Sequence, residues 1–312
     1  MDYTPLGNSG LLVSTLGVGC NAFGTRIDQD ATDAVVHAAL ESGVNFFDTA
    51  DAYGKGASET MLGRALGSRR DEVVIASKFG MDMQDTYPGA TSARASRHYV
   101  RRAVEGSLTR LGTDRIDLYQ LHTPDRITPI EETLSALTEL VQEGKVRYIG
   151  CSNFSAWEVV DADHVADAIG AEHFITAQNE YSLYNRAADS ELVPALEHTG
   201  MSMLPYFPLA YGLLTGKYRA GDAAPEGTRL ARETEAHRFA SADFDAVEAF
   251  RTFAEARGLA MLDVAIGGLA ALPTVGSVIA GATKAEQIEA NVAAVAWTPT
   301  ADDLAELATI VT

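Results

Sequence analysis

The sequence predicts an α/β fold, a closed (β/α)8 TIM barrel, because strand-like apolar runs alternate with helical patterns along nearly the whole chain. No strand leads into the G-x-G-x-x-G turn that opens a dinucleotide-binding doubly wound sheet, and this favours a barrel. The 312 residues exceed the roughly 250 of a typical barrel. They leave room for an N-terminal β-hairpin, long loops on the C-terminal face and a C-terminal helix. We therefore expect one domain over residues 1–312.

The expected barrel strands are short apolar stretches bounded by glycine or polar residues. They lie at 16–19, 44–48, 73–78, 116–121, 147–151, 175–178, 201–206 and 277–280. The helical patterns lie at 29–42, 58–67, 96–111, 129–143, 155–168, 189–199, 261–271 and 284–294. A hairpin at about residues 3–14, turning at 7–10, precedes the first barrel strand.

Glycines mark the ends of several predicted helices. Gly43, Gly112 and Gly144 each follow a helical pattern directly, as a glycine in the left-handed conformation does after a helix. At the other end, Ser58 is expected to cap the second helix, and Pro129 is expected in the first turn of the fourth.

Two loops are longer than a barrel needs, at residues 81–95 and 207–242. Each follows the carboxyl end of a strand, which is the face where barrel enzymes have their active sites. Long loops inside compact domains are usually functional or disordered. We expect these two loops, together with residues 20–26 and the segment after Trp297, to select the substrate.

Composition limits the possible partners and the compartment. A net charge of -19 and a pI near 4.7 argue against nucleic acid or an anionic membrane as a partner. A small anionic ligand is not excluded, because it responds to local charge. No apolar run approaches the roughly 18 residues of a membrane span, and the N-terminus does not resemble a signal peptide. Cys20 and Cys151 are far apart, and each follows a glycine near a strand end. They fit neither a disulfide framework nor a metal site, so we expect buried packing residues in a cytoplasmic, reducing environment.

Three consecutive strands end in side chains suited to proton transfer. The strand at 44–48 ends in Asp48, with Tyr53 in the following turn, and the next two strands end at Lys78 and His122. In a parallel barrel these ends share one face, so the four side chains should converge on one pocket. An acid, a phenol, an amine and an imidazole together indicate proton transfer to or from a small polar group such as a carbonyl oxygen.

Each of the four residues also fits an ordinary structural role on its own, but together they suggest a division of labour. A phenol has a pKa near 10 and is a poor acid at neutral pH unless its anion is stabilised, which the ammonium of Lys78 would do for Tyr53. Asp48 would keep Lys78 charged, because a buried unpaired ammonium loses its proton. His122 would donate a hydrogen bond to a carbonyl oxygen and orient it.

These segments resemble the aldo-keto reductase family, and the resemblance covers essentially the whole chain. Residues 3–11 (YTPLGNSGL) are similar to the family's hairpin, and residues 47–54 (FDTADAYG) to its aspartate and tyrosine signature. Residues 76–78 (ASK) and 121–125 (LHTPD) match the lysine and histidine segments. The resemblance implies NAD(P)H-dependent carbonyl reduction, in which hydride reaches carbon and Tyr53 gives a proton to oxygen.

The resemblance also implies a nicotinamide site at the next strand ends. Residues 150–154 (GCSNF) and 177–180 (AQNE) resemble the segments that bind the carboxamide, which places Ser152, Asn153 and Gln178 there. A flat amide needs both a donor and an acceptor, and Asn153 and Gln178 supply them. Residues 206–210 resemble the segment whose ring stacks on the nicotinamide. We expect Tyr206 rather than Phe207 to provide that ring.

The cofactor's phosphates are implied to lie further along the chain. Residues 209–218 resemble the strap over the pyrophosphate, and residues 281–291 resemble the adenosine-phosphate site at the start of the last predicted helix. The implied contacts are Leu209, Gly212, Leu214, Gly216, Lys217, Gly281, Thr283, Lys284, Gln287 and Asn291. Many family members have arginine near positions 283 or 287, and here Lys284 is the nearby cation.

The sequence therefore predicts reduction of a small-molecule aldehyde or ketone with NADPH, with NADH possible and no metal. Two alternatives are a cofactor-binding regulatory subunit with little turnover, as the family's channel subunits illustrate, and an enzyme working mainly as an NAD(P)-dependent alcohol or sugar dehydrogenase. A metal-dependent hydrolase is disfavoured, because no His-x-His pair ends a strand. The substrate, the direction of the reaction and the choice between monomer and homo-oligomer stay undetermined at this point.

Overall fold

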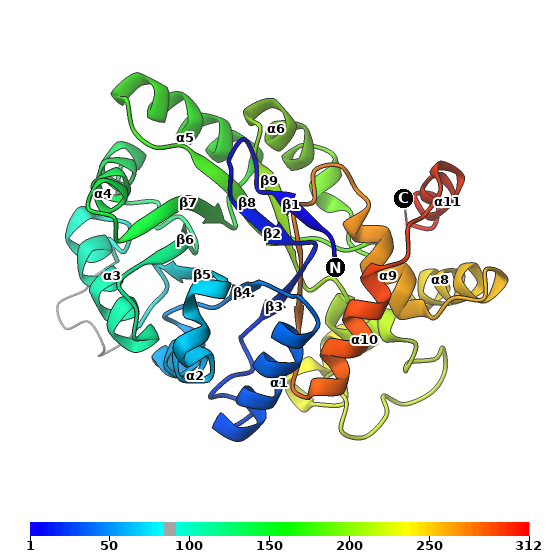
Figure 1. Cartoon of the computed structure of the whole chain (residues 1–312). Helices are drawn as coiled ribbons and strands as arrows, with labels where there is room; N and C mark the ends of the chain where they lie inside the picture. The colour runs from blue at the N-terminus through cyan, green and yellow to red at the C-terminus, as the bar shows by residue number, and fades with distance from the viewer. Residues whose placement is uncertain (84–91, 312) are drawn as a thin grey trace.

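The computed structural model describes residues 1–83 and 92–311, where eight parallel strands form a nearly closed barrel ringed by helices (Figure 1). Around the barrel the strand order is β10, β3, β4, β5, β6, β7, β8, β9. The strands are β3 (Leu16–Gly19), β4 (Phe46–Asp48), β5 (Val74–Phe79), β6 (Ile116–Leu121), β7 (Val146–Ser152), β8 (Phe174–Glu180), β9 (Ser202–Tyr206) and β10 (Val278–Gly281). The predicted fold class is confirmed, and each strand boundary lies within about two residues of its prediction.

The barrel closes between its last two strands through the segment that leads into β10. The Met203 N–H of β9 donates to the carbonyl of Thr274 at 2.8 Å, and the Met203 carbonyl accepts from Gly276 N–H at 2.9 Å. On the other side, β10 pairs with β3 in parallel from Val278 opposite Leu16 to Gly281 opposite Gly19. The first and last barrel strands are therefore neighbours.

The predicted helices between the strands are also present. They are α1 (Gln29–Glu41), α2 (Ala57–Leu66), α3 (Arg97–Leu111), α4 (Ile130–Gln142), α5 (Ala156–Ile169), α6 (Leu192–Thr199), α9 (Met261–Ala270) and α10 (Ala285–Val295). The expected C-terminal helix is α11 (Ala301–Leu307). Among the described residues, no helix combines the length and the apolar character needed to cross a bilayer.

Among the described residues, two further α-helices were not predicted. The short α7 (Ala236–Ala240) lies inside the long loop 207–242, and α8 (Phe244–Ala256) follows it. In α8, Val247, Phe250 and Ala254 are buried at helical spacing and form one apolar face. One helix was expected after each strand, whereas α7, α8 and α9 all lie between β9 and β10.

The N-terminal hairpin closes the amino-terminal end of the barrel. Strands β1 (Tyr3–Pro5) and β2 (Leu12–Ser14) pair antiparallel, as predicted, and Figure 1 shows them lying across the barrel. Leu6 and Val13 are fully buried and belong to a core cluster with the inward-facing Phe46, Leu118 and Leu204. Apolar hairpin side chains thus fill the bottom of the barrel.

Most predicted helix ends are confirmed, and two starts differ. Gly43, Gly112 and Gly144 all have positive φ just after their helices. Ser58 is not a cap: it lies inside α2, whose N-cap is Gly56 at φ 91°. The Ser58 hydroxyl instead donates to the carbonyl of Cys20 at 2.8 Å. The left-handed conformation of Gly56 turns the chain into α2, so the helix begins there without a side-chain cap. Pro129 is itself the N-cap of α4, one residue earlier than predicted.

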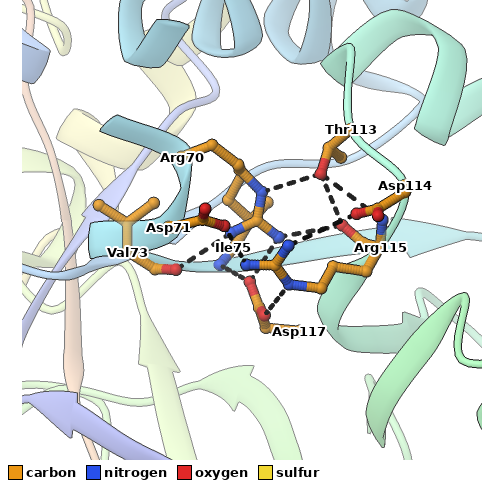
Figure 2. Close-up of polar contacts among 8 residues, drawn as sticks. All are labelled: Arg70, Asp71, Val73, Ile75, Thr113, Asp114, Arg115 and Asp117. Atoms are coloured by element: carbon orange, nitrogen blue, oxygen red, sulfur yellow. Dashed lines mark hydrogen bonds and ion pairs between the residues drawn. The ribbon is translucent and has the colours of Figure 1, made fainter. Parts of the chain in front are cut away.

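A polar cluster fixes β5 to β6 at their amino-terminal ends (Figure 2). The Arg70 guanidinium donates to the Asp117 carboxylate at 2.7 Å, to the Val73 carbonyl at 3.1 Å and to the Thr113 hydroxyl at 3.2 Å. The same Asp117 oxygen accepts from Ile75 N–H at 2.9 Å. This cluster lies at the opposite strand ends from Lys78 and His122, so it stabilises the fold away from the candidate site.

Candidate active site

A cavity of about 760 Å³ opens at the carboxyl ends of the barrel strands. Asp48, Tyr53 and His122 line it, and Lys78 lies fully buried behind Tyr53. These residues come from the ends of β4, β5 and β6 and from the turn after β4. The four side chains that the sequence singled out for proton chemistry therefore lie together.

The Lys78 ammonium is the centre of this group. It donates to the Asp48 carboxylate at 2.7 Å, to the Thr49 carbonyl at 2.9 Å and to the Tyr53 hydroxyl at 3.2 Å. An ammonium has three N–H donors, so these bonds use all of them. The side chain of Lys78 is 0% exposed and that of Asp48 is 3% exposed, which makes this a buried ion pair.

Asp48 is held in turn by two amides. Its second carboxylate oxygen accepts from Gln178 Nε2 at 2.9 Å and from Gln120 Nε2 at 3.3 Å. A buried carboxylate is tolerated when its lone pairs are satisfied and a cation neutralises it. Lys78, Gln178 and Gln120 together meet that condition and fix the carboxylate in place.

Burial and charge act in opposite directions on Tyr53 and Lys78. Burial raises the pKa of Tyr53 above its ordinary value, although the Lys78 ammonium acts to lower it. Burial alone would lower the pKa of Lys78, but Asp48 and Tyr53 raise it above its ordinary value, so Lys78 is charged at neutral pH. Lys78 thus acts to lower the pKa of Tyr53, as predicted, but burial of the phenol raises that pKa by more.

His122 lies edge-on to Tyr53, with ring centroids 5.9 Å apart and planes at 83°. Burial, reinforced by the Lys78 charge, lowers the pKa of His122 to about 3. The imidazole is therefore neutral at physiological pH and has one N–H to donate. Its buried Nδ1 has no hydrogen-bond partner in the part of the chain that the structure describes.

The ends of β7 and β8 bring Asn153 and its neighbours to the same cavity. Asn153 Nδ2 donates to the His122 carbonyl at 2.9 Å and to Ser152 Oγ at 3.0 Å, and Asn153 Oδ1 accepts from Tyr206 OH at 2.8 Å. Asn153 has φ 59°, and Phe207 has φ 55°. Positive φ is strained for side chains larger than glycine, and such strain gathers at functional sites.

The two aromatic residues at the end of β9 face different surroundings. Tyr206 bonds Asn153, near His122. Phe207 packs against Tyr211 with ring centroids 4.4 Å apart, and the Arg229 guanidinium lies 4.7 Å from the Phe207 ring centroid. Phe207 thus packs against residues of the long loop, whereas Tyr206 belongs to the polar group formed with Asn153 and His122.

The far end of the cavity lies at the start of α10. Gly281, Thr283, Lys284 and Gln287 line it, and Lys284 is the N-cap residue of the helix. The Gln287 side-chain oxygen accepts from Thr283 N–H at 2.7 Å and from the Thr283 hydroxyl at 3.1 Å. Gln287 therefore satisfies a backbone donor that would otherwise be open to an anion.

The structure brings most of the predicted cofactor contacts to this cavity, but not all of them. Ser152, Gln178, Leu209, Gly212 and Lys217 line it. Leu214, Gly216 and Asn291 do not, and Leu214 and Asn291 are almost fully buried. Leu214 instead belongs to the main apolar core.

Several lining residues were expected only as parts of loops. Asn21 and Arg26 come from the loop after β3, and Arg229 and Arg232 come from the loop 207–242. The signal available in the sequence was the concentration of cationic residues in a long loop at the active face. Their convergence on one cavity depends on contacts between distant segments, which a local pattern does not report.

Comparisons with known proteins identify a matching family model and several similar relatives. A family model described as the aldo/keto reductase family matches residues 15–312. An uncharacterized oxidoreductase of Bacillus subtilis (strain 168) is 36% identical over 303 residues, covering 95% of this chain and 91% of that protein. A probable voltage-gated potassium channel subunit beta of Oryza sativa subsp. japonica is 36% identical, covering 94% and 91%. An L-glyceraldehyde 3-phosphate reductase of Escherichia coli O157:H7 is 35% identical, covering 94% and 87%.

Proposed function

The chain belongs to the aldo/keto reductase family and is an NAD(P)H-dependent oxidoreductase, and from this premise we propose that it reduces an aldehyde or ketone of a small molecule with NADPH, using Tyr53 as the general acid. The observation that carries the proposal is the 3.2 Å contact between the Lys78 ammonium and the Tyr53 hydroxyl at the cavity wall. We also treat residues 1–312 as one catalytic domain, because the pairing of β3 with β10 joins both ends of the chain in one barrel.

Tyr53 has the position and the partner that proton transfer needs. Bound NADPH supplies a hydride for the carbonyl carbon. As the carbonyl oxygen gains negative charge, the Tyr53 O–H donates its proton to that oxygen. The resulting phenolate keeps its bond to the Lys78 ammonium, and this charge-assisted bond stabilises the anion. Alcohol oxidation uses the same phenolate as a base.

Asp48 acts on Tyr53 through Lys78. It keeps the ammonium charged inside the protein, and the two amides at Asp48 fix the orientation of the pair. Asp48 is therefore a positioning residue. Because its contact with Tyr53 is indirect, its loss should have a milder effect than the loss of Lys78.

His122 is assigned to orient the carbonyl oxygen. A neutral imidazole donates one hydrogen bond without adding a positive charge beside Lys78. The lowered pKa, about 3, keeps it in that form across the physiological range. Together Tyr53 and His122 give two donors for one carbonyl oxygen, which defines its place in the cavity.

The remaining residues fit a nicotinamide dinucleotide. Gln178 uses its Nε2 on Asp48, so its Oε1 is available to accept from a carboxamide, and Asn153 lies on the next strand end. Tyr206, fixed by its bond to Asn153, offers a ring face to the nicotinamide. Lys217 and Lys284 supply positive charge for the phosphates, and Gly212 and Gly281 leave space for backbone approach.

The preference for NADPH rests on Lys284. It lines the cavity at the start of α10, where a helix terminus favours negative charge. Thr283 and Gln287 are bonded to each other there and add no cation. A single lysine supports the 2′-phosphate but leaves NADH usable, so we expect activity with both cofactors and a preference for NADPH.

The test is turnover of a panel of simple aldehydes and ketones, followed as the loss of absorbance at 340 nm with NADPH and NADH in parallel. Wild type should turn over at least one aldehyde, and Tyr53→Phe should lose that activity while still binding cofactor. The channel-subunit relative motivates the alternative of a cofactor-binding regulatory protein. Tight NADPH binding without turnover of any carbonyl compound would favour that alternative.

A further inference from the structure

A second cavity shares one wall with the active cavity and has almost the same size. Its volume is about 740 Å³, against about 760 Å³ for the active cavity. It is bounded by the end of β8, by residues 184–190 and 210–213, and by the end of α7. Small-molecule sites in proteins have volumes of about 300–1,000 Å³, so this cavity is large enough for such a ligand.

The segment 209–213 separates the two cavities. Leu209 and Gly212 line the active cavity, whereas Ala210 and Leu213 line the second cavity. Tyr211 lines both of them. A ligand in the second cavity would therefore contact the wall of the first.

The backbone of this shared wall is strained. Phe207, Ala210 and Tyr211 have φ of 55°, 45° and 58°. Positive φ is costly for residues other than glycine and persists only where surrounding contacts hold it. The Tyr211 ring packs against Phe207 with centroids 4.4 Å apart, and its hydroxyl donates to the Glu180 carboxylate at 3.3 Å. A ligand that packed against Ala210 and Leu213 would add to these contacts and stabilise the wall.

Much of the second cavity is apolar. Leu213 and Leu230 are 4% and 2% exposed and belong to the main apolar core, so the cavity reaches down to that core. Ala242 and Val311 add further apolar surface, and the aromatic ring of Tyr184 contributes to the same lining. This lining suits the apolar or aromatic body of a small molecule.

The charges on the cavity wall are paired, with one exception. Arg186 pairs with Asp189 at 2.6 Å, and Arg238 pairs with Glu235 at 3.0 Å. Among the described residues, Glu180 is the one charged residue of this wall that forms no ion pair. The wall therefore offers one negative charge to a ligand.

Glu180 also has hydrogen-bonding capacity to spare. Its carboxylate accepts from two neutral donors, Asn185 Nδ2 at 3.2 Å and the Tyr211 hydroxyl at 3.3 Å. A carboxylate has about four acceptor positions, so a further donor can bind. An ammonium group would fill such a position and neutralise the charge in one charge-assisted bond.

From this lining we propose that the second cavity binds an organic ammonium ion with an apolar or aromatic body, and that its occupation strengthens cofactor binding in the active cavity. The ammonium donates to Glu180, and the body packs against Leu213 and Leu230. The inference goes beyond the proposed carbonyl reduction and requires only that the family's cofactor binds in the active cavity. A ligand that orders the shared wall leaves less ordering for the cofactor to do, so the two bind with positive coupling.

The first test is calorimetric binding of three probes to the full chain saturated with NADPH: 2-phenylethylamine, 2-phenylethanol and phenylacetate. The amine should bind about tenfold more tightly than the alcohol or the carboxylate, as expected for one charge-assisted hydrogen bond. Glu180→Gln keeps an acceptor for the Tyr211 hydroxyl and should remove this preference with little change for the alcohol. Equal affinities for the three probes in wild type, or a preference for phenylacetate, would overturn the inference.

Two further variants locate the binding site. Ala242→Phe places a ring in the second cavity and should weaken the amine and the alcohol alike, which keeps the test decisive if Glu180→Gln fails to fold. Glu191→Gln removes an exposed carboxylate that lines neither cavity and should leave the affinity for the amine unchanged. An amine whose affinity survives Ala242→Phe binds elsewhere, and the inference is then wrong.

The second test measures the coupling between the two cavities. NADPH is titrated by protein fluorescence with and without saturating 2-phenylethylamine, and the amine should lower the Kd of NADPH about fivefold. NADPH should lower the Kd of the amine by the same factor, because coupling between two sites is reciprocal. An NADPH affinity that stayed the same or fell would contradict the inference. Lack of turnover with every carbonyl compound would instead refute the proposed reduction and leave both binding tests decisive.

Discussion

The Lys78 ammonium lies 3.2 Å from the Tyr53 hydroxyl, and its other two bonds go to the Asp48 carboxylate and the Thr49 carbonyl. The geometry couples the ionisation of the phenol to a charge that is itself held by Asp48. Because burial raises the pKa of Tyr53, the phenol stays protonated at neutral pH and can act as an acid. The same contact stabilises the phenolate, which would be the base when an alcohol is oxidised to the carbonyl compound.

Replacing Tyr53 by phenylalanine should remove the proton donor and keep the ring. General acid catalysis typically contributes about 10²- to 10⁴-fold, so kcat for carbonyl reduction should fall by that factor. NADPH affinity, measured by quenching of protein fluorescence, should hardly change. A variant that kept half of the wild-type kcat would exclude Tyr53 as the acid.

Lys78→Met keeps an apolar stem of similar length but deletes the ammonium. The pKa of Tyr53 should rise further, so alcohol oxidation should require a higher pH, and both directions should slow by roughly 10²-fold. Asp48→Asn should act in the same direction more mildly. The double variant should be less impaired than the two single losses combined, because both act through one phenol.

The measurement is the pH–rate profile of alcohol oxidation for wild type, both single variants and the double. Circular dichroism at each pH separates catalytic loss from unfolding, since Lys78→Met leaves the buried Asp48 without its cation. An unshifted basic limb in Lys78→Met would show that this lysine is structural.

Lys284→Ala should weaken NADPH more than NADH. One charge-assisted contact is worth roughly 1.5–3 kcal/mol, or about ten- to a hundredfold in affinity. Titration of the two cofactors reports the ratio directly. Lys145→Ala is a matched control, because Lys145 precedes β7 and pairs with Glu105 and Glu143 on the surface. Equal losses for both cofactors in Lys284→Ala would show that the lysine does not recognise the 2′-phosphate.

His122 should not titrate in the range where free histidine does. Its pKa of about 3 lies well below pH 5, so kcat/KM for reduction should show no inflection from this group between about pH 5 and 8. His122→Gln should lower the rate, because the oriented donor is displaced, and should leave the shape of the profile unchanged. An inflection near pH 6.5 in wild type that vanished in His122→Gln would contradict this assignment.

Asp51 should make the fold less stable as the pH rises. The residue is fully buried, and neither carboxyl oxygen makes a well-formed hydrogen bond among the described residues; the nearby Ala52 N–H only partly offsets the burial. Burial, then the nearby Glu59, raises its pKa well above the ordinary value. The pKa of Asp51 is therefore higher in the folded state than in the unfolded state. The protonated carboxyl stabilises the fold at pH values below the unfolded-state pKa, and this stabilisation is lost as the pH rises toward the folded-state pKa.

Asp51→Asn abolishes this titration. Relative to wild type it should become increasingly stable above about pH 4, by roughly 1.4 kcal/mol for each unit by which the wild-type pKa is raised. Urea unfolding at a series of pH values measures the difference. Asp114→Asn, at an exposed site, is the control. A loss of stability in Asp51→Asn that grew as the pH rose would contradict this prediction, because it would mean that the ionised carboxylate makes a stabilising contact.

The barrel and the cluster of Asp48, Lys78 and His122 could be predicted from the sequence for a physical reason. A buried parallel strand is a short apolar run, and the polar residue that ends it must lie at the common carboxyl-end face. Asp48, Lys78 and His122 each end such a run, so topology alone brings them together. The helix ends at Gly43 and Gly112 were equally accessible, because a left-handed residue after a helix is a local requirement.

Other features depend on long-range contacts that no local pattern contains. Ser58 resembled a cap, but its hydroxyl bonds the distant carbonyl of Cys20. Leu214 was predicted to contact the cofactor, and its side chain packs in the core. Arg26 and Arg232 line the same cavity only because two loops that lie far apart in the sequence both reach it.

The pairing of β3 with β10 has a consequence for how the protein is made. The barrel stays open until residues 278–281 have left the ribosome, because only then does β3 obtain its second neighbour. Until that point the nascent chain presents an unpaired strand edge, which is a template for association with other chains. Ring closure over nearly the whole chain length also carries a large entropic cost, so it should come late in folding. Chaperone dependence and aggregation during overexpression should therefore depend mainly on how soon β10 is synthesised and pairs with β3. They should depend less on the stability of the completed barrel.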